Sequence, residues 1–422
     1  MSSSSSSAAS PGTAAPDLRS GQLRNLLLAT LASTAGFWAW TIVGPLSRRY
    51  AEQMELSSSQ TALLVAMPIF VGSIARVPVG ALTDRFGGRV MFTAILALTA
   101  PLVLLTALVG QLGSFVLLLV VAFFLGIAGT VFAIGIPFCS AWYESHRKGF
   151  ATGVFGAGMA GTAVSAFVTP RLVAGIGYLG AHAVIAAIVA AMAVVCWLGL
   201  RESPVRAGAV PQPVLPRIRH AFTLRVTWQL CFLYGVVFGA FVAFSNYLPT
   251  YLDTVYGFDA TAAGTRTAGF ALAAVVARPV GGILADRLGP KIVTITSLVG
   301  TAVLAMVVAL QPIQEVAYGA TFLAMAVFLG LGTGGVFGWV GRAAPAKDVG
   351  TIGGIIAAAG GLGGYFPPLV MGATYDAENN SYFVGLTLLA VFAVAALVLT
   401  FTVRNGGKVD ERSRACGPPG HR

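Results

Sequence analysis

Two stretches of the sequence are near copies of each other: residues 75–89 read ARVPVGALTDRFGGR, and residues 277–291 read ARPVGGILADRLGPK. They lie 202 residues apart, and in each an arginine stands eight residues before an Asp-Arg pair. Apolar residues surround Arg76 and Arg278, whereas the end of each stretch is charged and rich in glycine. The repeat indicates two related halves, each carrying one arginine inside an apolar segment.

The composition is typical of a membrane protein. Hydrophobic residues make up 56% of the chain and charged residues 10%, whereas a soluble domain has about 25% charged residues. The mean hydropathy is +0.83. Apolar runs of about 20 residues recur along the chain, and each is long enough to cross a hydrocarbon core of about 30 Å. Because backbone groups find no water there, each run is expected to be an α-helix.

The runs predict an all-α polytopic membrane protein with twelve transmembrane helices in two pseudosymmetric six-helix halves. The halves are expected over residues 25–200 and 225–404, separated by a basic, proline-rich linker at 201–224. Residues 1–24 and 405–422 are expected to be polar tails, and the first should be disordered because it has little apolar surface to bury. The helices are predicted at residues 25–46, 59–82, 89–110, 114–140, 149–171, 178–200, 225–250, 262–284, 291–311, 316–340, 350–373 and 381–403.

The basic residues are divided unequally between the two sides. With a cytoplasmic N-terminus, two of the 26 Lys and Arg residues lie within helices, four lie in outer loops and the other 20 are cytoplasmic. The four outer residues are Arg48, Arg49, Arg171 and Arg266. This bias is the positive-inside rule, so we expect a multi-pass protein of the inner cell membrane with both termini and the linker in the cytoplasm. The net charge of +11 reflects this orientation and does not indicate nucleic-acid binding.

The sequence indicates neither catalysis nor a bound cofactor. The four cysteines have no paired spacing, so neither a disulfide nor a metal site is expected. The four histidines, His146, His182, His220 and His421, are expected in loops or at helix ends. With no general acid or base inside the membrane, the chain is not expected to be an enzyme. A monomer surrounded by lipid is expected.

The two repeated arginines are expected near the centre of the membrane. Eight residues of helix span about 12 Å, and the half-thickness of the hydrocarbon core is about 15 Å. With Asp84 and Asp286 at the cytoplasmic edge, Arg76 and Arg278 therefore lie deep inside. An arginine at that depth costs about 2.5 to 3.5 kcal/mol on insertion scales, and snorkelling serves mainly residues a turn or so from the edge. Each arginine therefore needs a partner.

No acidic residue is placed to be that partner, because all 15 Asp and Glu residues are expected in loops or tails. Two deep positive charges without an internal counter-ion indicate an anion site. The guanidinium group presents a planar fork of donors that suits a planar oxyanion, and it stays charged at any relevant pH.

The repeated stretches also resemble a known motif. GALTDRFGGR and GILADRLGPK match the Gly-x-x-x-Asp-Arg-x-Gly-x-Arg/Lys loop of the major facilitator superfamily, in which two six-helix halves face each other across a central cavity. The resemblance implies that these residues belong to the cytoplasmic gate and carry no information on the substrate. The implied gating residues are Gly80, Asp84, Arg85, Gly87, Arg89, Gly282, Asp286, Arg287, Gly289 and Lys291.

Two glycine-rich stretches indicate a narrower resemblance. GGIIAAAGGLGGYFPPLVMG (353–372) closely resembles the helix 11 signature of the nitrate/nitrite porter family, and GVFGAGMAGTAVSAFVTPRL (153–172) resembles its helix 5 counterpart. Such glycines let helices approach closely and expose backbone groups to a small ligand. The family often has an asparagine in helix 5 where this chain has Met159. The implied substrate-binding glycines are Gly158, Gly161, Gly361, Gly363 and Gly364.

The same resemblance implies aromatic residues at the anion site. Tyr234 matches a helix 7 tyrosine whose hydroxyl donates to the anion. Phe132 and Phe337 match the pair of rings that sandwiches the anion. Phe37 and Trp38 in the first helix are further candidates to line the cavity.

Together these observations predict an alternating-access transporter of nitrate, nitrite or both. Exchange is favoured over proton symport, because no membrane-embedded carboxylate or histidine is expected to carry a proton. A carrier of small carboxylates such as formate or oxalate would use the same paired arginines. A nitrate-binding membrane sensor is the alternative of a different class. A drug exporter is disfavoured, since proton-driven efflux of cations usually needs a buried acid.

Overall fold

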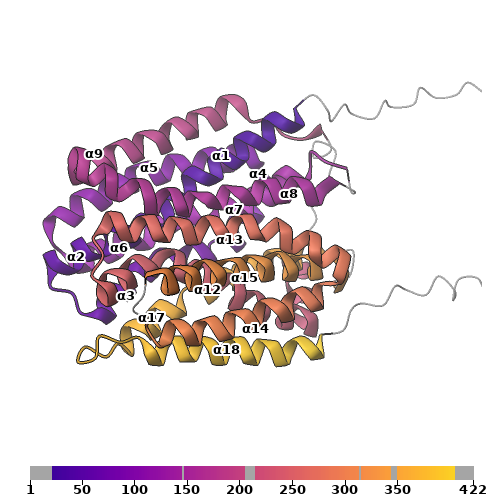
Figure 1. Cartoon of the computed structure of the whole chain (residues 1–422). Helices are drawn as coiled ribbons and strands as arrows, with labels where there is room; N and C mark the ends of the chain where they lie inside the picture. The colour runs from indigo at the N-terminus through magenta and orange to yellow at the C-terminus, as the bar shows by residue number, and fades with distance from the viewer. Residues whose placement is uncertain (1–20, 145–146, 205–213, 313–314, 344–348, 404–422) are drawn as a thin grey trace, which may run out of the picture.

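The protein is described by a computed structural model, which covers residues 21–144, 147–204, 214–312, 315–343 and 349–403. Every regular element in these residues is a helix, apart from an isolated β-bridge between Asp376 and Ser381. The helices lie side by side in one bundle, and both ends of the described chain lie at the same end of it (Figure 1). We call this the termini end and the opposite end, which carries α2, the distal end.

The first half is built from helices that are interrupted at several points. Its elements are α1 (Gln22–Trp40), η1 (Gly44–Leu46), α2 (Ser47–Met54), α3 (Ser58–Ile74), α4 (Arg76–Phe86), α5 (Gly88–Leu112), α6 (Phe115–Leu125), η2 (Gly126–Thr130), α7 (Val131–Ser140), α8 (Lys148–Gly156), η4 (Ala157–Ala160) and α9 (Gly161–Gly199).

The second half has longer continuous helices, and a short helix precedes it in the linker. Its elements are α11 (Val214–Thr223), α12 (Arg225–Tyr256), α13 (Ala260–Leu288), α14 (Pro290–Ala309), α15 (Glu315–Ala343), α16 (Val349–Gly363), α17 (Phe366–Ala373) and α18 (Phe383–Thr402). The tails at residues 1–20 and 404–422 and the linker residues 205–213 lie outside the described residues.

The described chain crosses the membrane twelve times. Ten helical segments are long and apolar enough to do so, or eleven when α3 and α4 count as one span bent by 41°. The bend lies at Ala75, where Pro78 lacks the N–H that would bond to Ile74. The longest segment contains Gly177 at φ 77° and ψ 168°, which joins two helices without a loop. When this segment is divided at Gly177, each half has six crossings, which confirms the predicted twelve-helix fold.

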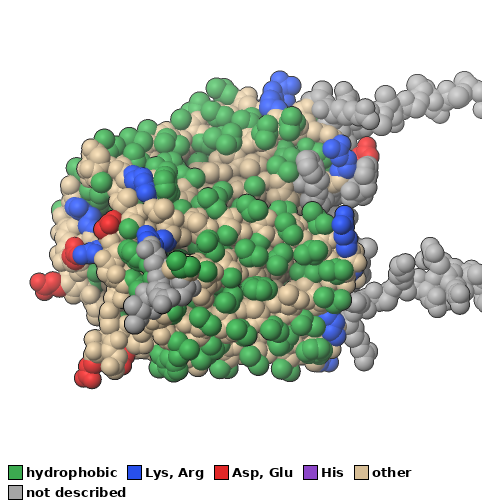
Figure 2. All heavy atoms as spheres, viewed as in Figure 1, with side chains coloured by type: hydrophobic (Ala, Val, Ile, Leu, Met, Phe, Trp, Pro, Cys, Tyr) green, Lys and Arg blue, Asp and Glu red, His purple; other side chains and the backbone are tan. Residues whose placement is uncertain are grey.

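The surface of the bundle suits a lipid environment. Figure 2 shows charged side chains at the two ends of the visible face and hydrophobic side chains between them. Large apolar residues are exposed along the described helices, among them Leu108, Phe124 and Val303. An apolar band of this extent on a protein surface indicates contact with a membrane.

The two repeated loops have the same backbone turn. Gly87 has φ 94° and Gly289 has φ 95°, a region that favours glycine because it lacks a Cβ. Gly87 joins α4 to α5, and Gly289 joins α13 to α14. The glycines therefore recur because each half needs the same tight turn between its second and third crossings.

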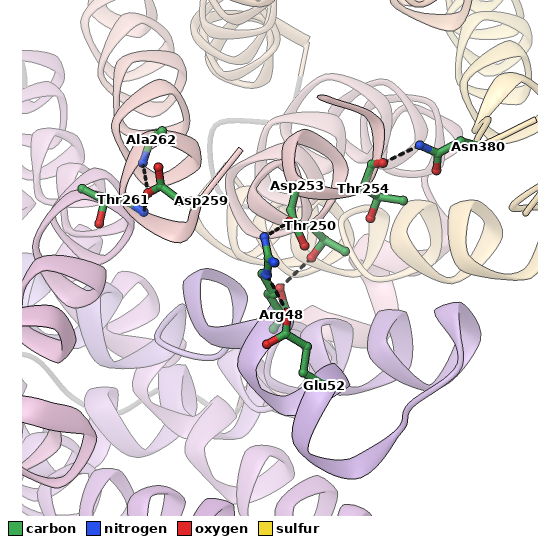
Figure 3. A network of polar contacts seen from close by, with 10 residues as sticks. Arg48, Glu52, Thr250, Asp253, Thr254, Asp259, Thr261, Ala262 and Asn380 are labelled. Atoms are coloured by element: carbon green, nitrogen blue, oxygen red, sulfur yellow. Dashed lines mark hydrogen bonds and ion pairs between the residues drawn. The ribbon is translucent and has the colours of Figure 1, made fainter. Parts of the chain in front are cut away.

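The two halves are joined at the distal end by a group of four residues that we call the distal latch: Ser47, Arg48, Thr250 and Asp253. Arg48 of α2 forms an ion pair with Asp253 of α12, in addition to one with Glu52 of its own helix (Figure 3). Beside it, the Ser47 and Thr250 hydroxyl oxygens lie 2.8 Å apart in a buried hydrogen bond. These contacts join the two halves at the distal end. Arg48 was expected in a loop, but the first helix continues as η1 and α2 beyond its apolar run.

Candidate anion-binding site

Arg76 is the first residue of α4, directly after the bend at Ala75. Its side chain is buried, with only 3% exposed. Its Nη1 donates to the backbone oxygen of Ala357 in α16 at 2.7 Å, so it contacts the opposite half. Its Nε and Nη2 are buried and have no hydrogen-bond partner among the described residues. One edge of this guanidinium group therefore keeps two free donors.

Arg278 lies within the continuous helix α13 and is held more completely. Its Nη1 lies 2.8 Å from the sulfur of Met159 in η4, a residue of the opposite half. Its Nη2 donates to the hydroxyl oxygen of Tyr234 at 3.3 Å. Met159, which departs from the family pattern, therefore contacts one of the two arginines directly.

Aromatic rings hold the two like charges close together. The guanidinium carbon of Arg76 lies 5.5 Å from the centre of the Phe132 ring and that of Arg278 lies 5.3 Å from it. The Phe238 ring is 5.9 Å from Arg76 and 5.8 Å from Arg278. A ring face carries partial negative charge that attracts a cation. Two rings shared between two arginines therefore offset part of the repulsion between them.

Phe337 and Tyr234 lie on the side of Arg278. The Phe337 ring centre is 5.6 Å from the Arg278 guanidinium carbon and 4.9 Å from the Tyr234 ring centre. Tyr234 in turn stacks on Phe238, with ring centres 4.8 Å apart. The structure thus brings Arg76, Arg278 and the three aromatic residues predicted by resemblance into one cluster. Their role in binding an anion stays a prediction.

No carboxylate neutralises this cluster in the described part of the chain. Neither Arg76 nor Arg278 belongs to an ion pair that the structure gives for these residues, whereas Arg48 and Arg342 do. The expectation that all acidic residues lie in loops or tails is wrong in detail, because Asp84, Asp253 and Asp286 lie near the ends of helices. The helices extend past their apolar runs, so these carboxylates remain at the ends of the bundle.

The predicted glycines are positions of close packing between helices. A Cβ on Gly158 or Gly161 would come within 3 Å of Ser33 or of the Thr34 backbone in α1. A Cβ on Gly363 would lie 2.1 Å from the Gly235 oxygen in α12. Gly361 is the member beside the cluster, since a Cβ there would lie 2.2 Å from the Ser73 hydroxyl and 3.1 Å from Nη1 of Arg76.

Gly364 also packs on α12, where an added Cβ would lie 2.8 Å from the Val242 side chain. Of the five glycines, therefore, the structure brings only Gly361 against an arginine. A contact between any of these glycines and a bound anion stays a prediction.

The predicted gating residues lie at the termini end, and several have partners within their own half. The Glu202 carboxylate accepts from the backbone N–H of Arg89 at 2.8 Å and lies against Gly87. Arg342 Nη2 lies 3.4 Å from the Asp286 carboxylate.

The other gating residues are less constrained. Arg85 contacts the Phe86 ring, Lys291 contacts the Phe401 ring, and Arg287 is exposed. Gly80 and Gly282 have open space where a Cβ would be. The gating role of the ten residues stays a prediction.

Sequence reasoning missed three parts of the cluster. Phe238 lies one helical turn after Tyr234, so the aromatic spacing in α12 could have indicated it. Trp40 lies 5.9 Å from Arg76 and donates from its ring nitrogen to the Pro68 oxygen. The Ala357 oxygen could not be found from sequence, because a backbone acceptor leaves no signal in the residue type.

The two candidates in α1 pack differently. Phe37 packs against Phe132 and Trp40, with ring centres 6.3 Å and 5.4 Å away. Trp38 donates to the Thr169 hydroxyl in α9 at 3.0 Å, within the first half. Phe37 therefore supports the ring that both arginines share, whereas Trp38 joins two helices of the first half.

His182 is more buried than its predicted position at a helix end suggested. It lies in α9, five residues after Gly177, and is fully buried. Its Nδ1 is 2.8 Å from the backbone oxygen of Tyr178, and its Nε2 has no partner among the described residues. The Tyr178 ring also faces Arg49 at 4.4 Å. The charged group near His182 is therefore a cation.

Comparisons with known proteins define the class. The family model described as Major Facilitator Superfamily matches residues 26–266 and 254–415. A solved bacterial homologue of the human lysosomal transporter Spinster, inward-facing and unoccupied, is similar with a TM-score of 0.70 and 18% identity over 92% of this chain and 97% of that chain. A D-xylose–proton symporter has a TM-score of 0.70 and 15% identity over 92% and 98%. The fold and the matched family are those of a membrane transporter, not an enzyme.

Sequence relatives narrow the family. The probable nitrate/nitrite transporter NarK2 of Mycobacterium tuberculosis (strain ATCC 25618 / H37Rv) is 57% identical over 90% of this chain and 96% of its own. The nitrite extrusion protein of Bacillus subtilis (strain 168) is 34% identical over 89% and 92%. The probable nitrate/nitrite antiporter NarK1 of Thermus thermophilus is 36% identical over 83% and 85%. This chain belongs to the major facilitator superfamily and, within it, to the nitrate/nitrite porter family.

Proposed function

We propose that this protein transports nitrate and nitrite by alternating access and binds the anion between Arg76 and Arg278. The free edge of Arg76 is the observation that carries the proposal. Nε and Nη2 lie side by side on one edge of a planar group, are buried, and have no partner among the described residues. Such a fork matches two oxygens of a planar oxyanion, and a buried charge without a partner is unfavourable.

The rest of the cluster supports a small, flat ligand. Phe132 and Phe238 stack at a ring-centre distance of 6.5 Å and an angle of 26°, and both face the two guanidinium groups. Buried rings exclude water, which strengthens the attraction between the arginines and an anion. The names of the relatives in Mycobacterium, Bacillus and Thermus support nitrate and nitrite as the anions.

The contacts of the arginines suggest how binding is coupled to movement. Arg76 belongs to the first half and bonds to Ala357 of the second, whereas Arg278 belongs to the second and contacts Met159 of the first. An anion bound by both arginines would add a further contact between the two halves at the arginine cluster. Binding would therefore favour states in which the halves are drawn together at the cluster.

Exchange of one anion for another is the mode that we propose. Without an anion, two facing positive charges disfavour closure, whereas a bound anion neutralises part of them. Arginine does not release its proton, so the cluster offers no simple proton carrier. His182 does not fill this role, because its protonation would place a second cation near Arg49 without a described acidic partner.

The decisive experiment measures labelled nitrate entry into proteoliposomes. Inward movement of an anion against a negative interior costs about 2.3 kcal/mol per charge per 100 mV, and exchange of equal charges avoids this cost. We expect uptake into vesicles loaded with nitrate or nitrite, little uptake into empty vesicles, and no response to a pH gradient. Uptake into empty vesicles that rises with an inward proton gradient would establish proton symport instead.

The same vesicles distinguish a nitrate/nitrite exchanger from a small-carboxylate carrier and from a sensor. Formate or oxalate inside the vesicles would drive nitrate entry if the arginines accept any small oxyanion. Binding of nitrate in detergent without entry under any loading would indicate a sensor. We expect nitrite to drive entry more strongly than formate or oxalate, since the relatives in Mycobacterium, Bacillus and Thermus are named for nitrate and nitrite.

A further inference from the structure

Met159 and Arg278 form a contact that the transport proposal does not itself explain. Met159 lies in η4, between α8 and α9, and is 2% exposed. Its sulfur lies 2.8 Å from Nη1 of Arg278 in the opposite half. A cavity of about 10 Å³ adjoins both residues, which is about the space that one water needs. The contact is therefore tight, and a larger group would not fit beside it.

Pseudosymmetry makes the contact informative. The offset that carries Arg76 onto Arg278 carries Met159 onto Gly361. Gly361 lies against Arg76 in the same way, since a Cβ there would be 3.1 Å from Nη1. The same position thus faces the arginine of the opposite half twice. In one copy a side chain reaches the guanidinium group, and in the other no side chain is present.

The two arginines therefore differ in how many of their N–H donors lack a partner. Arg76 keeps Nε and Nη2 unpartnered, whereas Nη1 and Nη2 of Arg278 contact Met159 and Tyr234. A thioether sulfur is only a weak acceptor. It therefore orients the guanidinium group but competes poorly with an oxyanion, which makes charge-assisted hydrogen bonds that are about twice as strong as neutral ones.

We propose that Met159 is a positioning residue that holds Arg278 in the anion-free protein through a weak contact, which the bound anion displaces. The inference rests on the proposed anion site and adds that binding is stepwise. The free edge of Arg76 receives the anion first. Arg278 then leaves the sulfur and completes the site, so the strength of the Met159 contact sets the affinity for the anion.

Two substitutions of similar size test this role. Met159→Gln supplies an amide oxygen, a strong acceptor that Arg278 must leave before it binds the anion. Met159→Leu supplies no acceptor. Met91→Gln is the matched control, because Met91 is a buried methionine of the first half, 7% exposed and located in α5. KM and the maximal rate are measured for nitrate–nitrite exchange in proteoliposomes, and size-exclusion profiles check folding.

We expect Met159→Gln to raise KM about tenfold, because a charge-assisted hydrogen bond replaces a weak contact, and to keep the maximal rate within about twofold. Met159→Leu and Met91→Gln should leave KM unchanged or, for Leu, lower it. Equal increases for Gln and Leu would show that Met159 only packs, and an unchanged KM for Gln would show that the contact does not compete with the anion. Either result overturns the inference.

A parallel Arg278→Lys variant separates this inference from the proposed function. If Arg278→Lys weakens exchange while Met159→Gln does not, the anion site stands and the role of Met159 fails. If Arg278→Lys exchanges nitrate normally, the anion does not need this arginine, and both proposals fail.

Discussion

Arg76 and Arg278 are equivalent in the repeat but not in their surroundings. Arg76 keeps two donors free, whereas Arg278 is held by a sulfur and a hydroxyl group. The apolar context and the missing acidic partners predicted both arginines. They did not predict this difference, because it depends on which backbone and side-chain atoms the opposite half brings to each guanidinium group.

Lysine at either position is expected to weaken transport strongly. Arg76→Lys and Arg278→Lys keep the positive charge but lose the planar fork. We expect each substitution to raise KM for nitrate about tenfold or more, because at least one charge-assisted hydrogen bond is lost. Arg76→Lys should have the larger effect. Initial uptake rates measure this, with the exposed Arg225→Lys as control. Near-normal uptake by both site variants would show that the arginines are structural.

Helix breaks are the features that sequence patterns predicted least well. The twelve apolar runs indicated the number of crossings and their approximate bounds. They did not indicate the bend at Ala75, the junction without a loop at Gly177, or the continuation of the first helix into α2. Hydrophobicity reports which segments lie in lipid, whereas these breaks depend on single Pro and Gly positions and on neighbouring helices.

Close packing of α16 on α12 provides a test within one element. A Cβ on Gly363 would lie 2.1 Å from the Gly235 oxygen, a backbone atom that cannot turn aside. Gly354 of the same helix is exposed, with nothing within 4 Å of an added Cβ. We expect Gly363→Ala to reduce folded protein severely in detergent and Gly354→Ala to be neutral or slightly stabilising. Similar melting curves for the two variants would contradict the packing argument.

The arrangement of the halves could be predicted only in part. The repeat and the charge bias predicted two facing halves, but not how the halves contact each other at the distal end. That depends on the distal latch, whose residues lie in different halves and are about 200 positions apart. No local pattern connects Arg48 with Asp253.

The distal latch is expected to control access from its side. Arg48→Ala removes the ion pair between the halves, whereas Glu52→Gln removes only the pair within α2. The reporter is a cysteine at Thr61, which lines the cavity beside the latch, in a chain without its native cysteines. We expect Arg48→Ala to raise the rate at which an impermeant thiol reagent labels this cysteine about two- to fivefold, because a partly exposed ion pair contributes only modestly. An equal rise with Glu52→Gln would exclude a role in closure.

Orientation in the membrane is a prediction for the whole molecule. The charge bias places both termini and the linker in the cytoplasm, and the described chain ends lie together at one end (Figure 1). Reporter fusions at Arg24, Ser203 and Arg404 should all report the cytoplasm. A periplasmic signal at any of them would contradict the twelve-crossing topology.

The breaks in the first half have a mechanical consequence. Ala75, η2 and η4 map through the repeat onto continuous stretches of α13, α15 and α16. A 3-10 turn has weaker hydrogen bonds than an α-helix. The backbone of the first half should therefore be more flexible at Ala75, η2 and η4 than the second half is at the equivalent positions. Amide deuterium uptake should therefore be faster at residues 126–130 and 157–160 than at residues 328–332, and bound nitrate should slow it there. The bound anion would thus rigidify the broken helices of the first half.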